Sequence, residues 1–105
     1  TKSYPHDAYA NEEDLAKGIF NFEEVVSYSV KRITSSWAGL RTFAPDRTLV
    51  IGFDRDISSF FWLAGQGGYG FQTSAAASKM ASEIILGKKS SFGQLQKRVS
   101  PDRFK

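Results

Sequence analysis

The chain has 105 residues, of which 41% are hydrophobic and 14% aromatic, and its formal net charge is +3. This length allows one domain at most, and the apolar content is too high for a disordered segment. The sequence has no cysteine and a single histidine, His6. That composition excludes a disulfide framework, an iron–sulfur site, a thiol nucleophile and a multi-histidine metal centre. We therefore predict no metal site and no catalytic Cys or His.

Charge is distributed unevenly along the chain. Residues 1–30 hold two basic and six acidic side chains, whereas residues 79–105 hold seven basic and two acidic ones. The basic tail is either a solvated surface or a binding region for an anionic partner. Its basic residues do not alternate with aromatic ones, so we predict no nucleic-acid partner. No apolar run approaches the roughly 20 residues of a membrane span, and no signal peptide is evident, which predicts a cytoplasmic protein without a membrane span.

The first predicted element is a helix over about residues 11–27. Asn11 is a favourable N-cap, and the three acidic residues after it suit the positive end of the helix dipole. The apolar residues that follow recur at spacings of four, three and four and form one stripe: Leu15, Ile19, Phe22 and Val26.

Extended chain is predicted next, as strands near residues 33–43, 49–53 and 60–64. The first is rich in β-branched and aromatic residues, and a turn at residues 44–47 separates it from the second. The third reads Phe-Phe-Trp-Leu-Ala and is wholly apolar, as in strands that are covered on both faces.

A second helix is predicted over residues 69–86, and we expect it to pack against the strand that leads into it. Five apolar residues share one side of this helix: Ala77, Met80, Ala81, Ile84 and Ile85. Gly87 stands where a helix end favours a left-handed residue. Residues 90–105 are predicted as loop with one short helical turn.

A glycine-rich loop, Gly65-Gln66-Gly67-Gly68-Tyr69-Gly70, joins the last strand to this helix. It fits the G-x-G-x-x-G pattern of dinucleotide-binding units, but no second strand follows and no acidic residue is placed to hold a ribose. Glycines still allow close approach of a ligand, and a helix start offers free N–H groups to an anion or electron-rich group. The alternative is a tight turn that binds nothing.

Arg41 lies within an apolar stretch that favours extended structure, where burial of its charge requires a partner. Its planar guanidinium matches a carboxylate through two hydrogen bonds. That carboxylate belongs either to a ligand or to one of three nearby acidic residues: Asp46, Asp54 or Asp56.

These two clusters together resemble the C-terminal portion of the D-amino-acid oxidase superfamily of FAD enzymes. The resemblance rests on Trp-Ala-Gly-Leu-Arg-Thr-Phe at residues 37–43, on Asp46 and residues 50–52, and on residues 61–70. The form GQGGYG-x-Q-T, followed by SAAAS, is most similar to D-arginine dehydrogenase and related bacterial D-amino-acid dehydrogenases. The closing segment, residues 100–104, also looks like the tail of such enzymes.

The resemblance implies an α+β fold that is the C-terminal fragment of a two-domain FAD-binding flavoenzyme of the glutathione-reductase-like type. The partner of this fragment would be the rest of that enzyme, with its N-terminal FAD-binding segment; the chain begins with Thr rather than Met. Residues 1–47 would end the substrate-binding domain and residues 48–105 the FAD-binding domain. The fragment alone would be inactive.

The resemblance also implies roles for single residues. The FAD cofactor would contact seven residues: Gly65, Gly67, Gly68, Tyr69, Gly70, Phe71 and Gln72. Arg41 would bind the carboxylate of the amino-acid substrate, while Gly68 and Gln72 would hold its amine or imine end. The enzyme would oxidise a D-amino acid or related amine to the imino acid by hydride transfer to flavin N5, without a catalytic side chain in this segment. The alternatives are a glycine- or sarcosine-oxidase-like amine oxidase, and a non-enzymatic interaction module with a basic tail.

Overall fold

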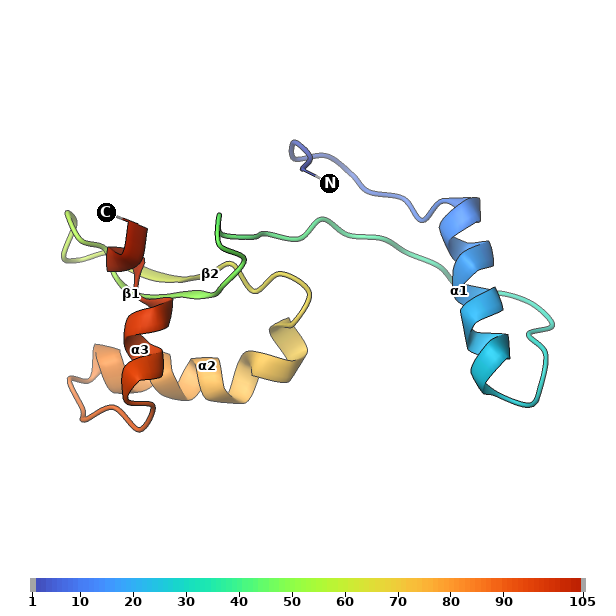
Figure 1. Cartoon of the computed structure of the whole chain (residues 1–105). Helices are drawn as coiled ribbons and strands as arrows, with labels where there is room; N and C mark the ends of the chain where they lie inside the picture. Colours follow the sequence, from blue (N-terminus) through green and yellow to red (C-terminus); the bar gives the residue numbers. More distant parts are fainter. Residues whose placement is uncertain (1, 105) are drawn as a thin grey trace. The chain divides into compact units, whose positions relative to one another are not determined.

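The computed structural model describes residues 2–104. Its elements are helix α1 (Glu12–Val25), strands β1 (Val50–Phe53) and β2 (Phe61–Ala64), helices α2 (Gly70–Ile85) and α3 (Gln94–Val99), and the 3₁₀ helix η1 (Pro101–Phe104) (Figure 1). They form two compact units that divide between Leu40 and Arg41. The first unit contains α1, and the second contains all the other elements. The predicted domain boundary after residue 47 stays a prediction.

Helix α1 confirms the first predicted element. The Asn11 side-chain oxygen accepts the N–H of Asp14 at 2.7 Å, and the Asn11 amide donates to the Asp14 carboxylate at 2.8 Å. This reciprocal bonding caps the helix start. However, no residue of α1 is buried. The apolar stripe is only partly covered, since Leu15 and Ile19 are half-buried.

The predicted strand at residues 33–43 is wrong. Residues 26–49 contain neither helix nor strand, and the sheet of the described chain consists of β1 and β2 alone. A strand forms only where a neighbour accepts and donates its backbone hydrogen bonds. The β-favouring residues of this segment have no such neighbour, so the chain stays irregular there.

Strands β1 and β2 form an antiparallel hairpin that confirms the predicted strands at residues 49–53 and 60–64. Val50 lies opposite Ala64, and Phe53 lies opposite Phe61. Asp54 organises the connection, because its carboxylate accepts three hydrogen bonds of 2.9 Å, from two backbone N–H groups of the turn and from the indole of Trp62. These donors lower the pKa of Asp54, first of all the Trp62 indole.

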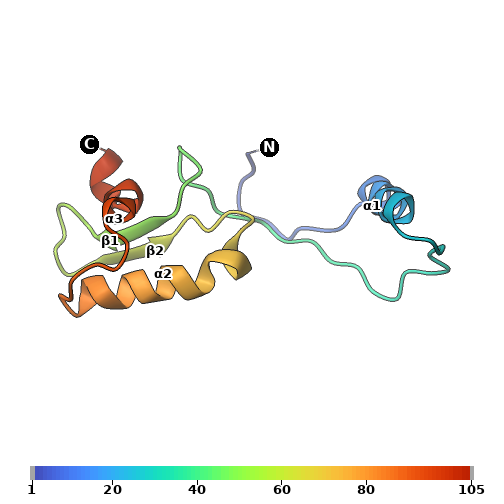
Figure 2. The ribbon, with the colours of Figure 1, turned by 60° about the horizontal axis from the view of Figure 1, so that its bottom comes forward.

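The core lies between the hairpin and α2, which form two layers (Figure 2). Its buried residues are Ile51 of β1, three residues of α2 and one of α3: Ala77, Met80, Ala81 and Val99. Helix α2 packs mainly against β1, not against the preceding strand β2 as predicted. Its two buried alanines allow close approach to Ile51. Ile85 is 54% exposed because it lies at the edge of the buried stripe.

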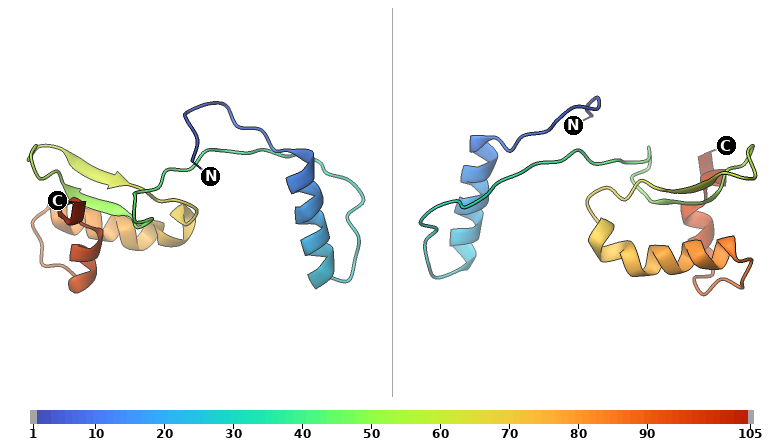
Figure 3. Two further views of the ribbon diagram at one scale, coloured as in Figure 1. Left: turned by 45° about the horizontal axis from the view of Figure 1, so that its top comes forward. Right: turned by 180° about the vertical axis from the view of Figure 1, so that it is seen from behind.

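The end of α2 matches the predicted glycine stop. Gly87 has φ +66°, its N–H donates to the Ile84 carbonyl at 3.2 Å, and the Lys88 N–H donates to the Glu83 carbonyl at 2.8 Å. This is the paired bonding of a left-handed helix cap. The tail then holds more helix than predicted, because α3 and η1 both contact β1 (Figure 3). None of the helices described is long and apolar enough to cross a bilayer.

Candidate functional site

The glycine loop between β2 and α2 packs closely on residues 42–44. Gly65 and Gly67 have φ of +71° and +54°, a region that favours glycine. The Gly67 N–H donates to the Thr42 carbonyl at 3.0 Å, and a Cβ added at Gly67 would lie 2.6 Å from Cε1 of Phe43. A side chain does not fit at Gly67 without displacing the Phe43 ring. The path of the loop therefore depends on glycine and on the neighbouring segment.

The start of α2 is open to a ligand. The N-cap residue, Tyr69, makes no side-chain capping hydrogen bond, and the first turn contains no acidic residue. The first N–H groups of a helix have no intrahelical acceptor and carry its positive dipole end. Tyr69, Phe71 and Gln72 are exposed, Phe71 completely so at 101%. The free N–H donors at the start of α2 suit a ligand with an electron-rich group.

Arg41 lies beside the same loop, in the same unit. Its Nη1 atom is 3.8 Å from the position of a Cβ built on Gly68. The expected environment was wrong in one respect: Arg41 is exposed and lies in irregular chain, not in a buried strand. The charge is thus hydrated, and burial imposes no need for an ion pair.

The three acidic residues considered as partners of Arg41 are otherwise engaged. Asp46 pairs with Arg103 at 2.7 Å, Asp54 binds the Trp62 indole, and Asp56 lies 3.7 Å from Arg55. Within residues 2–104, no ion pair of Arg41 is found. The guanidinium edge is therefore open to a carboxylate from outside these residues.

A cavity of about 360 Å³ lies elsewhere. It opens on the hairpin face opposite α2 and is lined by Val50, Trp62, Phe43, Pro101 and Phe104, among others. Of the predicted site residues only Gly65 lines it. The other predicted residues form an open surface around the start of α2, not a closed pocket.

The structure thus brings together the predicted loop residues, Gln72 and Arg41. Sequence reasoning assigned no contact to Thr42 and Phe43, which support Gly67, although both belong to the 37–43 motif. It also missed the pair between Asp46 and Arg103. Arg103 belongs to residues 100–104, the segment that resembles the tail of such enzymes. That resemblance was the one sequence signal that pointed to this residue.

A close-packed glycine loop, an uncapped helix start and an unpaired arginine define a site that suits an electron-rich ligand carrying a carboxylate nearby. A family model described as FAD dependent oxidoreductase matches residues 3–84. The chain belongs to this family, and its cofactor is FAD. The match includes Arg41 and the whole glycine loop, whereas α3 and η1 lie outside it. The predicted superfamily is confirmed.

Proposed function

We propose that this chain forms the C-terminal part of an enzyme that oxidises D-amino acids or related amines to imino acids. The observation that carries the proposal is the position of Arg41 beside Gly68, at the open start of α2. The incomplete burial of the α1 stripe and the 83% exposure of Trp37 support a larger protein that covers these surfaces. Bound FAD supplies the acceptor for the hydride of the substrate.

The glycine loop and the first turn of α2 hold the cofactor in this proposal. The first-turn N–H groups of Gly70, Phe71 and Gln72 would hold the electron-rich part of the cofactor. The positive end of the helix dipole would favour negative charge on the group bound there. Gly65, Gly67, Gly68 and Tyr69 would line the cofactor, and the three glycines would let the backbone approach it closely.

Arg41 binds the substrate carboxylate through two parallel hydrogen bonds. The Gly68 carbonyl and the Gln72 side chain would hold the amine end, and together with Arg41 they would orient the substrate for oxidation. No side chain of residues 2–104 is assigned as a base. Arg41, Gly68 and Gln72 contribute by positioning the substrate, and such positioning accounts for large rate effects.

Within the family, the loop form GQGGYG-x-Q-T favours a dehydrogenase similar to D-arginine dehydrogenase over an oxidase. A panel of D-amino acids, glycine and N-methyl amino acids separates these classes when both oxygen consumption and reduction of an artificial acceptor are measured. We expect flavin absorbance in the purified enzyme and turnover of D-amino acids with the artificial acceptor. Colourless protein that FAD does not reconstitute would overturn the proposal in favour of an interaction module.

The role of Arg41 is tested by Arg41→Lys, which keeps the charge and removes the two-pronged geometry. We expect a loss of about 2–4 kcal/mol in transition-state binding, equal to about a 30- to 1000-fold loss in kcat/KM, with flavin content unchanged. Arg55→Lys is the matched control, because Arg55 lies in the exposed hairpin connection. Near-normal kinetics of Arg41→Lys would remove Arg41 from the site, and loss of flavin would make its role structural.

A further inference from the structure

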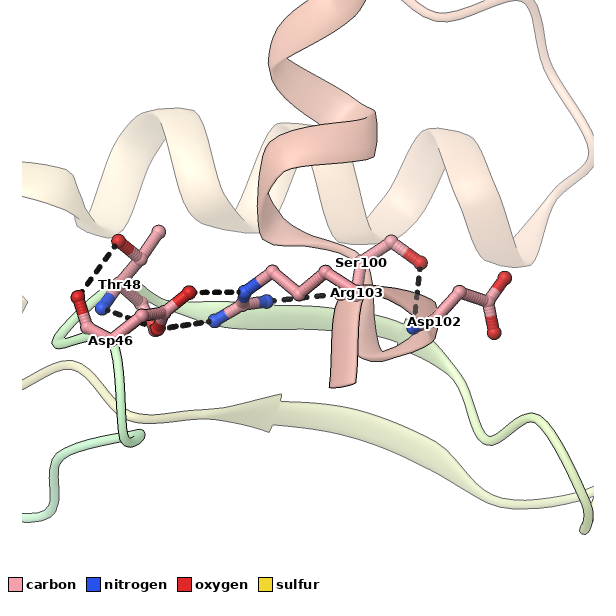
Figure 4. Close-up of polar contacts among 5 residues, drawn as sticks. All are labelled: Asp46, Thr48, Ser100, Asp102 and Arg103. Atoms are coloured by element: carbon pink, nitrogen blue, oxygen red, sulfur yellow. Dashed lines mark hydrogen bonds and ion pairs between the residues drawn. The ribbon is translucent and has the colours of Figure 1, made fainter. Parts of the chain in front are cut away.

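Arg103, in the terminal 3₁₀ helix, forms the most extensive side-chain contact of the described chain (Figure 4). Its Nε and Nη2 atoms donate to the two carboxylate oxygens of Asp46 at 2.7 and 3.0 Å. Nη2 also donates to the Thr48 carbonyl at 2.9 Å, and Nη1 donates to the Ser100 carbonyl at 3.0 Å. The Arg103 side chain is 15% exposed. A charged, two-pronged pair of this kind is among the stronger polar contacts in proteins.

The pair holds a turn that is not favourable on its own. Arg47 has φ +61°, which costs energy for a residue other than glycine, and its N–H donates to the Ala44 carbonyl at 2.9 Å. Asp46 also accepts the N–H of Thr48 at 3.1 Å. The conformation of residues 44–48 therefore depends on Asp46, which Arg103 fixes from outside the turn.

This turn contacts the glycine loop directly. A Cβ built on Gly65 would lie 3.5 Å from both the Ala44 nitrogen and the Thr48 carbonyl oxygen. Immediately before the turn, Thr42 accepts the N–H of Gly67, and Phe43 packs against that glycine. Arg41 precedes these residues by one position. The position of Arg41 beside Gly68 is thus set by residues 41–48. The other end of this segment is bound to Arg103 through Asp46 and Thr48.

We propose that Arg103 is a positioning residue: paired with Asp46, it fixes residues 44–48 so that Arg41 lies beside Gly68 in the orientation that binds a substrate carboxylate. This inference rests on the proposed function of Arg41. Arg103 itself contacts neither substrate nor cofactor. It lies outside the residues that the family model matches.

The competing role for the pair is attachment of the tail to β1. Two other contacts already provide that attachment. Val99 is buried in the core at 5% exposure, and a Cβ on Gly52 would lie 3.0 Å from Cδ of Pro101. Removal of the Arg103 guanidinium therefore leaves the tail in place and releases mainly the turn.

The test uses the flavin-loaded enzyme that contains this chain, with Arg103→Ala and Arg103→Lys. The ratio of kcat/KM for a D-amino acid to that for its carboxamide measures carboxylate recognition, and loss of folded protein alone does not alter it. We expect Arg103→Ala to reduce the ratio by about 10-fold, mostly through KM of the amino acid, because small misplacement of a binding group has effects of this order or larger. The ratio for Arg103→Lys is expected to lie between that of Arg103→Ala and that of the unmodified enzyme.

Arg98→Ala is the matched control. Arg98 is an exposed residue of the same tail, and no ion pair of its side chain is found within residues 2–104. We expect its ratio to equal that of the unmodified enzyme. If Arg103→Ala does not retain flavin, Asp46→Asn replaces it, because this change removes the pair's charge while keeping the size of the side chain.

A second measurement does not depend on turnover. Amide hydrogen exchange at Gly67 reports the bond to the Thr42 carbonyl, and we expect about 10-fold faster exchange in Arg103→Ala than in Arg98→Ala. If the unmodified enzyme treats acid and carboxamide alike, the proposed function of Arg41 fails. If it discriminates and Arg103→Ala or Asp46→Asn leaves the ratio unchanged, only the positioning role is overturned.

Discussion

Helices α1 and α2 differ in what stabilises them. Helix α2 buries Ala77, Met80 and Ala81 against the hairpin, whereas α1 buries no residue. Both have an apolar stripe, and α1 has the better N-cap, since Asn11 caps it and Tyr69 makes no capping bond in α2. A cap contributes about 1 kcal/mol, which is less than the burial of a single large side chain.

The difference shows that an amphipathic pattern indicates a helix without indicating whether its partner is present. Short isolated helices are marginal in water, and most helical stability in proteins comes from tertiary packing. Helix α1 therefore depends on a surface outside its own unit for full burial of its stripe, whereas α2 is stabilised within its own unit. In the enzyme that we propose, the rest of the protein provides that surface.

Truncation of one apolar side chain in each helix tests this contrast most strongly. Met80 is 3% exposed in the core, so Met80→Ala should lower the free energy of unfolding by about 2–5 kcal/mol. Ile19→Ala should cost less, about 1 kcal/mol, because Ile19 is only half-buried and alanine favours helix. Guanidinium unfolding monitored by far-UV circular dichroism, which reports on both helices, measures both.

Equal costs for Met80→Ala and Ile19→Ala would show that α1 is packed as firmly as α2 and would end the contrast. In the larger enzyme, where we expect the stripe of α1 to be covered, Ile19→Ala should become costly. Comparison of the same variant in the two contexts therefore locates the missing surface.

Glycine replacements test how closely the second unit is packed around its loop. Gly67→Ala combines a left-handed backbone with the contact of 2.6 Å to Phe43, and should cost about 2–4 kcal/mol of stability. Gly87→Ala is the matched control: its φ is +66° but no atom lies within 4 Å, so we expect about 1 kcal/mol. A Gly67→Ala cost no larger than that of Gly87→Ala would show that Phe43 moves freely.

A glycine-to-alanine replacement in the first unit should stabilise the structure instead of destabilising it. Gly18 lies inside α1 with no atom within 4 Å of an added Cβ, so Gly18→Ala should increase helix content, by an amount equivalent to about 0.5–1 kcal/mol. Far-UV circular dichroism measures this change. A decrease in helicity would indicate that another segment contacts the α1 surface at Gly18.

The smallest expected effect is a pH dependence of the second unit. The Arg103 hydrogen bonds are the main cause that lowers the pKa of Asp46 from 3.8 to about 2. Because the folded pKa is below the unfolded one, the pair stabilises the fold fully above about pH 4, and this contribution is lost as the pH falls toward 2. Asp46→Asn should therefore show a smaller decline in Tm between pH 5 and pH 2.

Asp102→Asn is the control for that measurement, since Asp102 lies in the same tail and has no ion pair within residues 2–104. The pKa values of Asp54 and Glu83 are also lowered, by hydrogen bonds from Trp62 and Ser91, so part of the decline should remain in Asp46→Asn. Identical declines in the two variants would show that the Asp46–Arg103 pair contributes nothing to stability.

Local signals in the sequence predicted the elements whose causes are local. The cap at Asn11, the glycine stop at Gly87 and the apolar spacing of α2 depend on residues a few positions apart, and the structure confirms each of them. The motifs around Arg41 and the glycine loop were recognisable for a similar reason. They are short contiguous stretches, and the family match confirms the superfamily they indicate.

Pairing between distant segments was decided by the tertiary structure alone. The residues at 33–43 favour extended chain, but a strand needs a neighbour and none is available, so the predicted strand is absent. Arg103 and Asp46 are 57 positions apart, and no local pattern shows that this carboxylate meets Arg103 and not Arg41. Propensity acts within a few residues, whereas hydrogen-bond partners and burial depend on which segments the folded chain brings together.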